Sequence, residues 1–120
     1  MKTVMLVDDV AISNFMMKKM LGKVAPEFDV IEFTSPEQAI NSIKESSPDL
    51  IFLDLNMPHI DGWKFLSLMN ENNLDHKVYI LTSSTNQLDI QQSKQYKNVI
   101  GFLVKPLNLK SLPDALKVMD

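Results

Sequence analysis

Acidic, hydroxyl and amine side chains follow four apolar runs of this chain, each at the point where the run ends. Asp8 and Asp9 follow the first run, and Asp54 ends the second. Thr82 follows the third run, and Lys105 follows the fourth. Carboxylates hold divalent cations, while an ammonium and a hydroxyl suit phosphate oxygens. These residue types predict metal-assisted phosphoryl chemistry if the fold brings the five side chains together.

Asp54 is the strongest of these signals. It follows Leu50-Ile51-Phe52-Leu53, four large apolar residues that predict a strand buried on both faces. A carboxylate at the rim of a hydrophobic sheet is costly to ionise unless a cation or hydrogen-bond donors hold it. Because folding does not require an acid at this point, a chemical role is favoured over that of a simple turn residue.

The three carboxylates repel one another if they share one rim. At an effective dielectric of about 20 and a separation of roughly 5 Å, each pair costs on the order of 3 kcal/mol. A divalent cation relieves this repulsion, and Mg²⁺ suits one or two carboxylates together with waters and a phosphoryl oxygen. Mg²⁺ is therefore the predicted cofactor.

The elements that must position these residues alternate along the chain. Apolar runs predict strands, and the segments between them have helical periodicity or helix caps. The predicted strands are 3–7, 29–33, 50–54, 77–81 and 100–104, and the predicted helices are 13–23, 36–46, 61–69, 86–96 and 112–119. This alternation predicts one α/β domain over residues 1–120, built from five βα units around a parallel sheet.

Topology makes the strand ends the place for a site. Short connections and right-handed crossovers put helices on both faces of such a sheet and all the strand ends on one edge. Ligands bind in the crevice beyond those ends, so the five polar residues are expected to share one cleft, although the sequence alone does not fix the strand order. In the first helix, Ile12, Phe15 and Met16 recur at helical spacing, and Met16, Met17 and Met20 are interpreted as helix packing.

Composition excludes several function classes. The chain has 120 residues, 45% hydrophobic and 22% charged, which is typical of a soluble globular domain. A net charge of -3 without a basic stripe argues against nucleic-acid binding. The absence of cysteine excludes disulfides and thiol catalysis. No signal peptide is recognisable, and no apolar run approaches the roughly 20 residues of a membrane span, so we expect a cytoplasmic protein with no membrane partner.

Taken together and in order, the motifs at the strand ends resemble those of response-regulator receiver domains of the CheY type. The matching segments are Val7-Asp8-Asp9, Asp54-Leu55-Asn56-Met57-Pro58 with Asp61-Gly62, Thr82-Ser83, and Phe102-Leu103-Val104-Lys105-Pro106. The resemblance covers essentially the whole chain. It implies a doubly wound, flavodoxin-like (βα)5 fold with the strand order 2-1-3-4-5.

The resemblance also implies a reaction. Asp54 would accept a phosphoryl group from a phosphohistidine of a sensor histidine kinase or a histidine phosphotransfer protein, with Lys105 and Thr82 contacting the phosphoryl oxygens. Asp9 and Asp54 would ligate Mg²⁺ directly, with the backbone carbonyl of Asn56 as a further ligand and Asp8 acting through water.

A switch follows by the same resemblance. Movement of Thr82 toward the phosphoryl group would let Phe102 turn inward and alter the surface of the fourth helix, fifth strand and fifth helix. Because phenylalanine has no hydroxyl, we expect Phe102 to prefer the buried orientation even without phosphate. Asn56 and Ser84 occupy the positions that tune the lifetime of the phosphate.

Several functions remain open. The leading one is a stand-alone switch, a monomer or weak dimer, that catalyses only its own phosphotransfer and dephosphorylation and acts on a downstream protein that the sequence does not name. Alternatives are a docking module that signals without phosphorylation, or a receiver cut from a longer regulator or hybrid kinase. A Mg²⁺-dependent phosphohydrolase would need a second acid where Asn56 stands. A flavin carrier would need a hydroxyl- and glycine-rich loop after the first strand.

Overall fold

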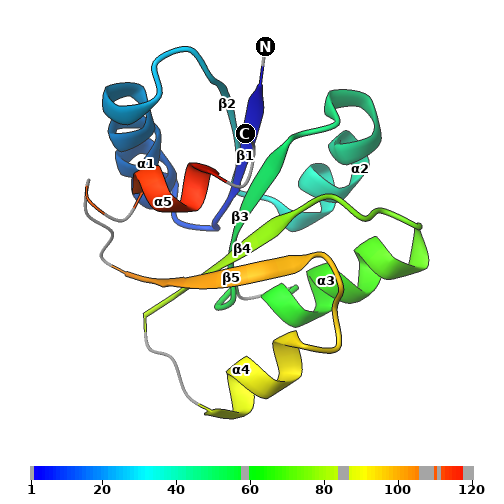
Figure 1. The fold of residues 1–120 in the computed structure, drawn as a ribbon. Helices are drawn as coiled ribbons and strands as arrows, with labels where there is room; N and C mark the ends of the chain where they lie inside the picture. Colours follow the sequence, from blue (N-terminus) through cyan, green and yellow to red (C-terminus); the bar gives the residue numbers. More distant parts are fainter. Residues whose placement is uncertain (1, 58–59, 84–86, 106–109, 111, 118–120) are drawn as a thin grey trace.

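The computed structural model describes residues 2–57, 60–83, 87–105, 110 and 112–117 (Figure 1). The strands are β1 (Thr3–Val7), β2 (Asp29–Phe33), β3 (Leu50–Asp54), β4 (Val78–Thr82) and β5 (Val99–Val104). The helices are α1 (Ala11–Val24), α2 (Pro36–Ser46), α3 (Gly62–Glu71), α4 (Gln87–Ser93) and α5 (Leu112–Leu116). The sheet is parallel with the order β2-β1-β3-β4-β5, which confirms the predicted fold class and strand order.

Two hydrophobic clusters hold the helices on opposite faces of the sheet. Figure 1 shows α1 and α5 on one side and α2 and α3 on the other. Successive strand residues alternate between the clusters, so Met5 and Val7 face α2 and α3 while Val4 and Leu6 face α1 and α5. Strand β3 lies at the centre of the sheet, and all five of its residues are buried. The strand that carries Asp54 is therefore the most enclosed part of the fold.

Helix α1 presents a different face to the core from the one that the apolar pattern suggests. Ile12, Phe15 and Met16 are 60, 50 and 59% exposed, while Met17 and Leu21 are buried. The interpretation of Met16 as a packing residue is therefore wrong, whereas Met17 is confirmed as one and Met20 is half-buried.

The rotation of α1 has a polar cause. The side-chain amide of Asn14 is buried and donates hydrogen bonds of 3.1 Å to the backbone carbonyls of both Asp8 and Phe33. A buried amide without these partners would be costly, so Asn14 must face the strand ends. Once Asn14 faces inward, Met17 and Leu21 follow at i+3 and i+7, and Ile12 and Phe15 turn to the surface.

The other helices follow their patterns more closely. Helix α2 begins at a cap, because the Ser35 hydroxyl accepts from the Gln38 amide at 3.3 Å and Pro36 opens the helix. Helix α4 is shorter than predicted, and Tyr96 lies beyond it, stacked on Trp63 with the ring centroids 6.0 Å apart. Within the described part of the chain, no helix has the length and apolar character needed to cross a membrane.

Candidate functional site

The carboxyl ends of the strands bring the predicted site residues together. Val7 of β1 pairs with Leu53 of β3, so the residues that follow them lie side by side. Asp8, Asp9 and Asp54 each offer a carboxylate oxygen, and these oxygens all lie within 4.8 Å of one another. This convergence is the one that the topology predicts.

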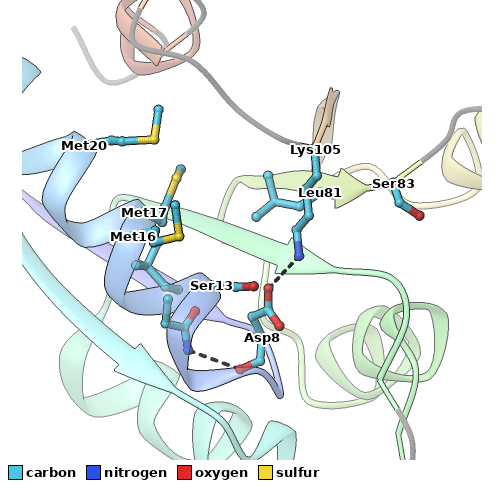
Figure 2. A pocket seen from close by; sticks show the side chains of 10 residues that line it. Asp8, Ser13, Met16, Met17, Met20, Leu81, Ser83 and Lys105 are labelled. Carbon is cyan, nitrogen blue, oxygen red and sulfur yellow. Dashed lines mark hydrogen bonds and ion pairs between the residues drawn. The ribbon is translucent and has the colours of Figure 1, made fainter.

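Asp8 is fixed from several directions. Only 2% of the residue is exposed. One carboxylate oxygen accepts a hydrogen bond of 2.9 Å from the Val10 amide, and the other lies 2.6 Å from Lys105 Nζ (Figure 2). Its backbone amide donates to the Phe33 carbonyl at 3.1 Å, which ties the residue to the end of β2. Asp8 is thus held in place by these bonds and accepts a hydrogen bond from the Lys105 ammonium.

Lys105 connects the ends of three strands. Its backbone amide donates to the Thr82 carbonyl at 2.7 Å, so the end of β4 positions the residue after β5. Its ammonium lies 2.6 Å from an Asp8 oxygen and 3.7 Å from an Asp54 oxygen. Thr82 itself is 3% exposed. The resemblance implies that Lys105 contacts a phosphoryl group, and here the same ammonium bridges two of the acids.

Asp54 is buried among charges of both signs. It is 6% exposed, and one of its oxygens accepts a hydrogen bond of 3.3 Å from the Asn56 amide. Burial raises the pKa of Asp54 above its usual value; Lys105 and the Asn56 amide oppose the rise, while Asp8 and Asp9 add to it. The ionised carboxylate therefore costs free energy in the absence of a cation.

This raised pKa predicts how stability depends on pH when no metal is present. Between the unfolded pKa of Asp54 and its higher folded pKa, the folded state binds more protons, so the free energy of unfolding falls as pH rises. In Asp54→Asn this contribution is absent. We expect the variant to gain stability over the parent as pH rises above about 4, the unfolded value. Urea denaturation in EDTA across this range measures the difference; a constant difference would contradict the prediction.

A buried oxygen of Asp9 shows whether the residues of the site suit a metal ion. One of its carboxylate oxygens is buried and has no hydrogen-bond partner among the described residues. A buried acceptor left unpaired is costly, and a cation removes the cost. Three carboxylates within 4.8 Å are a hard oxygen donor set, so the residues fit Mg²⁺. Asn56, whose backbone carbonyl is the further predicted ligand, is exposed and lies two residues after Asp54, the last residue of β3.

Gly62 has a role that the sequence analysis does not identify. A side-chain carbon built on this glycine would lie 2.8 Å from the Leu55 Cα and 3.1 Å from the Asp54 carbonyl oxygen. The start of α3 therefore packs directly on the backbone that carries Asp54. The adjacent Asp61 caps α3 by accepting from the Lys64 amide at 2.9 Å. A glycine directly after a helix cap is the sequence signal for such a close approach.

Asn14 is the second residue that the sequence analysis does not identify. Its signal in the sequence is a polar residue between the apolar positions of a helix. The apolar periodicity of the helix does not include such a residue.

The predicted switch and lifetime residues are only partly described. Phe102 pairs with Ile80 across β4 and β5, and its half-buried side chain packs against the cluster that contains α2 and α3. Ser84 lies outside the described residues.

Comparisons with known proteins agree with this geometry. The family model of the response regulator receiver domain matches residues 4–117. The nitrate/nitrite response regulator NarL of Escherichia coli K12 is 30% identical over 115 residues, which cover 95% of this chain and 52% of that protein. The chemotaxis protein CheY of Bacillus subtilis is 29% identical over 113 residues, which cover 94% of this chain and 92% of that protein.

The likeness extends to solved structures. Chemotaxis protein CheY4 of Vibrio cholerae has a TM-score of 0.86 at 24% identity, covering 100% of this chain and 99% of that one. This match supports the fold. The chain spans about half the length of NarL, 52%, and nearly the whole length of the Bacillus CheY, 92%.

Proposed function

Because the chain belongs to the response regulator receiver domain family, we propose that it is a phosphorylatable switch of two-component signal transduction. Asp54 accepts the phosphoryl group from a phosphohistidine of a sensor histidine kinase or a histidine phosphotransfer protein. The observation that carries the proposal is the meeting of Asp8, Asp9 and Asp54 with Lys105 at one edge of the sheet. A docking module without this chemistry would have no need of three acids that repel one another.

Asp54 is the proposed nucleophile. One of its carboxylate oxygens forms a bond to phosphorus while the bond from phosphorus to the histidine nitrogen breaks, giving an acyl phosphate. Lys105 and the Asn56 amide favour the ionised carboxylate that this attack requires. Asp9, Asp54 and the Asn56 carbonyl would hold Mg²⁺, with Asp8 acting through water, and the ion would neutralise charge on the nucleophile and on the phosphoryl oxygens.

Lys105 exchanges partners in the proposed reaction. In the structure its ammonium is held by Asp8 at 2.6 Å. Phosphorylation adds a charge of about -1.5 to -2 with strong acceptor oxygens, which attracts the ammonium away from Asp8. The Thr82 hydroxyl donates to another phosphoryl oxygen. The movement of these two residues, at the ends of β4 and β5, couples the site to the proposed output surface of α4, β5 and α5.

A direct test follows Mg²⁺ and phosphate separately. Trp63 stands next to Gly62 at the start of α3, close to the site, so its fluorescence should change on Mg²⁺ addition. Acetyl phosphate should then add one phosphoryl group per chain by intact mass, and EDTA should prevent the gain. If Mg²⁺ binds but neither acetyl phosphate nor a phosphohistidine donor phosphorylates the chain, the docking alternative replaces this proposal. Absence of Mg²⁺ binding would overturn the site assignment itself.

The switch proposal predicts the behaviour of Phe102. Because its ring lacks a hydroxyl, we expect it to keep its contacts with the core beside Ile80 with and without phosphate. In Phe102→Tyr, the hydroxyl favours water, so the ring should leave these contacts when unphosphorylated and regain them on phosphorylation. Nuclear Overhauser contacts between the ring and Ile80 measure this. Loss of the contacts in the unphosphorylated parent would refute the expectation.

A further inference from the structure

A cavity of about 430 Å³ lies between α1 and the carboxyl ends of the strands (Figure 2). Met16, Met17 and Met20 of α1 line one side, and Leu6 and Leu81 line the side formed by the sheet. Asp8 and Lys105 line both the cavity and the proposed phosphorylation site, but neither Asp9 nor Asp54 is among the described residues of the cavity wall, so the two sites overlap only at this ion pair. Its size is within the roughly 300–1,000 Å³ that small-molecule sites occupy.

The cavity has a polar end. Asp8, Ser13, Asn14, Ser83 and Lys105 also line it, and Figure 2 shows the ion pair between Asp8 and Lys105 there. Asp8 already accepts hydrogen bonds with both carboxylate oxygens, and Asn14 uses both hydrogens of its amide nitrogen. The Ser13 and Ser83 hydroxyls have no hydrogen-bond partner in the part of the chain that the structure describes. Figure 2 shows the Ser83 oxygen pointing away from the methionines, so the Ser13 hydroxyl is the group available to a ligand beside them.

The local charge restricts the kind of ligand. Asp8, Asp9 and Asp54 lie together, and Lys105 is the one cation among the described residues paired with them. In metal-free protein an anionic head group would face this excess of negative charge, and a cationic one would meet the Lys105 ammonium that already occupies Asp8. A neutral head group with one hydrogen-bonding function avoids both costs.

We propose that this cavity binds a small, uncharged amphipathic molecule. Its apolar body lies between the methionines of α1 and Leu81, and its single hydroxyl or amide group bonds to Ser13. Methionine side chains are unbranched and polarizable, which lets such a wall adapt to ligands of differing shape. A bound molecule also confines Lys105, so it slows phosphorylation; this consequence rests on the proposed function, whereas the binding does not.

The eight methionines make the binding directly observable. With ¹³C-labelled methionine methyl groups, 1-octanol should shift the signals of Met16, Met17 and Met20 to saturation. Met5, Met57 and Met69 are internal controls, because they belong to the cluster on the opposite face of the sheet. In EDTA, octanoate, with the same chain length and a negative head group, should bind at least about tenfold more weakly. Equal shifts at the control methionines, or tighter binding of octanoate, would overturn the proposal.

Matched variants test the position of the ligand. Met16→Glu puts a charge on the cavity wall, and Phe15→Glu puts the same charge on a neighbouring residue that does not line it. Both side chains are exposed, 59 and 50%, so both variants should fold. Met16→Glu should abolish the octanol-dependent shifts at Met17 and Met20, and Phe15→Glu should retain them. Ser13→Ala should weaken octanol by about two- to tenfold.

The competing occupants give different results. If a second copy of the chain fills the cavity, the Met17 and Met20 signals will depend on protein concentration without octanol, and the proposal fails. Saturating octanol should slow the gain of phosphate from acetyl phosphate in the parent and have no such effect in Met16→Glu; an unchanged rate in the parent would overturn the coupling. A chain that takes no phosphate at all contradicts the proposed function, while the methyl shifts still decide the binding.

Discussion

Replacing Asp54 with asparagine is expected to abolish the gain of phosphate from acetyl phosphate or from a phosphohistidine donor. The amide keeps the shape of the side chain but has no anionic oxygen to attack phosphorus. It also removes one of the carboxylates that repel one another, so the variant should remain folded. Because burial raises the pKa of Asp54, the neutral amide suits this position better than the ionised acid does in metal-free protein. Loss of phosphorylation will therefore not reflect loss of the fold.

Asp75→Asn is the matched control for this prediction. Asp75 is an exposed acid in the connection before β4, at the edge of the parallel sheet opposite the carboxyl ends, and Asp75→Asn makes the same change of charge as Asp54→Asn. Intact mass should show one phosphoryl group on the parent and on Asp75→Asn, and none on Asp54→Asn. A phosphoryl group on Asp54→Asn, mapped to Asp8 or Asp9, would show that the acceptor is misassigned.

Alanine substitutions at two glycines should have opposite effects on stability. Gly62→Ala places a carbon 2.7 Å from Leu55 Cδ2 and 2.8 Å from its Cα, and backbone cannot move aside as a flexible side chain can. Overpacking of this kind costs about 1–3 kcal/mol. Gly22→Ala meets nothing within 4 Å on the exposed side of α1, and its better helix propensity should stabilise the protein by up to about 1 kcal/mol.

Urea denaturation measures both glycine changes. The midpoint should fall for Gly62→Ala and rise for Gly22→Ala, with the dependence on denaturant unchanged. Gly62→Ala should also weaken Mg²⁺ binding, because the displaced backbone carries Asp54. An unchanged urea midpoint in Gly62→Ala would mean that α3 and the end of β3 are not held in rigid contact.

Much of the fold follows from local sequence patterns. Apolar runs of about five residues alternate with capped or amphipathic segments, and this alternation leaves few topologies for the chain. The cap at Ser35 and the buried stripe of Phe65, Leu66 and Met69 are local features of this kind. The convergence of Asp54 with Asp8 follows from parallel strands ending at one edge. The strand order itself required the resemblance to a known family.

The rest depended on contacts between distant segments. The rotation of α1 is determined by the bonds from Asn14 to two carbonyls, one of them 19 residues away at Phe33. An apolar periodicity cannot include such a bond, and it therefore selected Ile12, Phe15 and Met16, which face the surface. The pairing of Lys105 with Asp8, 97 residues apart, is likewise a property of the folded site. Residue types indicated the chemistry, but tertiary hydrogen bonds determined the geometry.

The enclosure of β3 has a consequence for hydrogen exchange. Amides in a fully buried central strand exchange with solvent only when the whole domain opens, whereas short exposed elements such as α4 exchange through local openings. Asp54 is the last residue of that strand. Any ligand or covalent group that stabilises the folded site therefore slows exchange across the central strands by the full change in global stability. The slowest amides of the protein report directly on the occupancy of its proposed phosphorylation site.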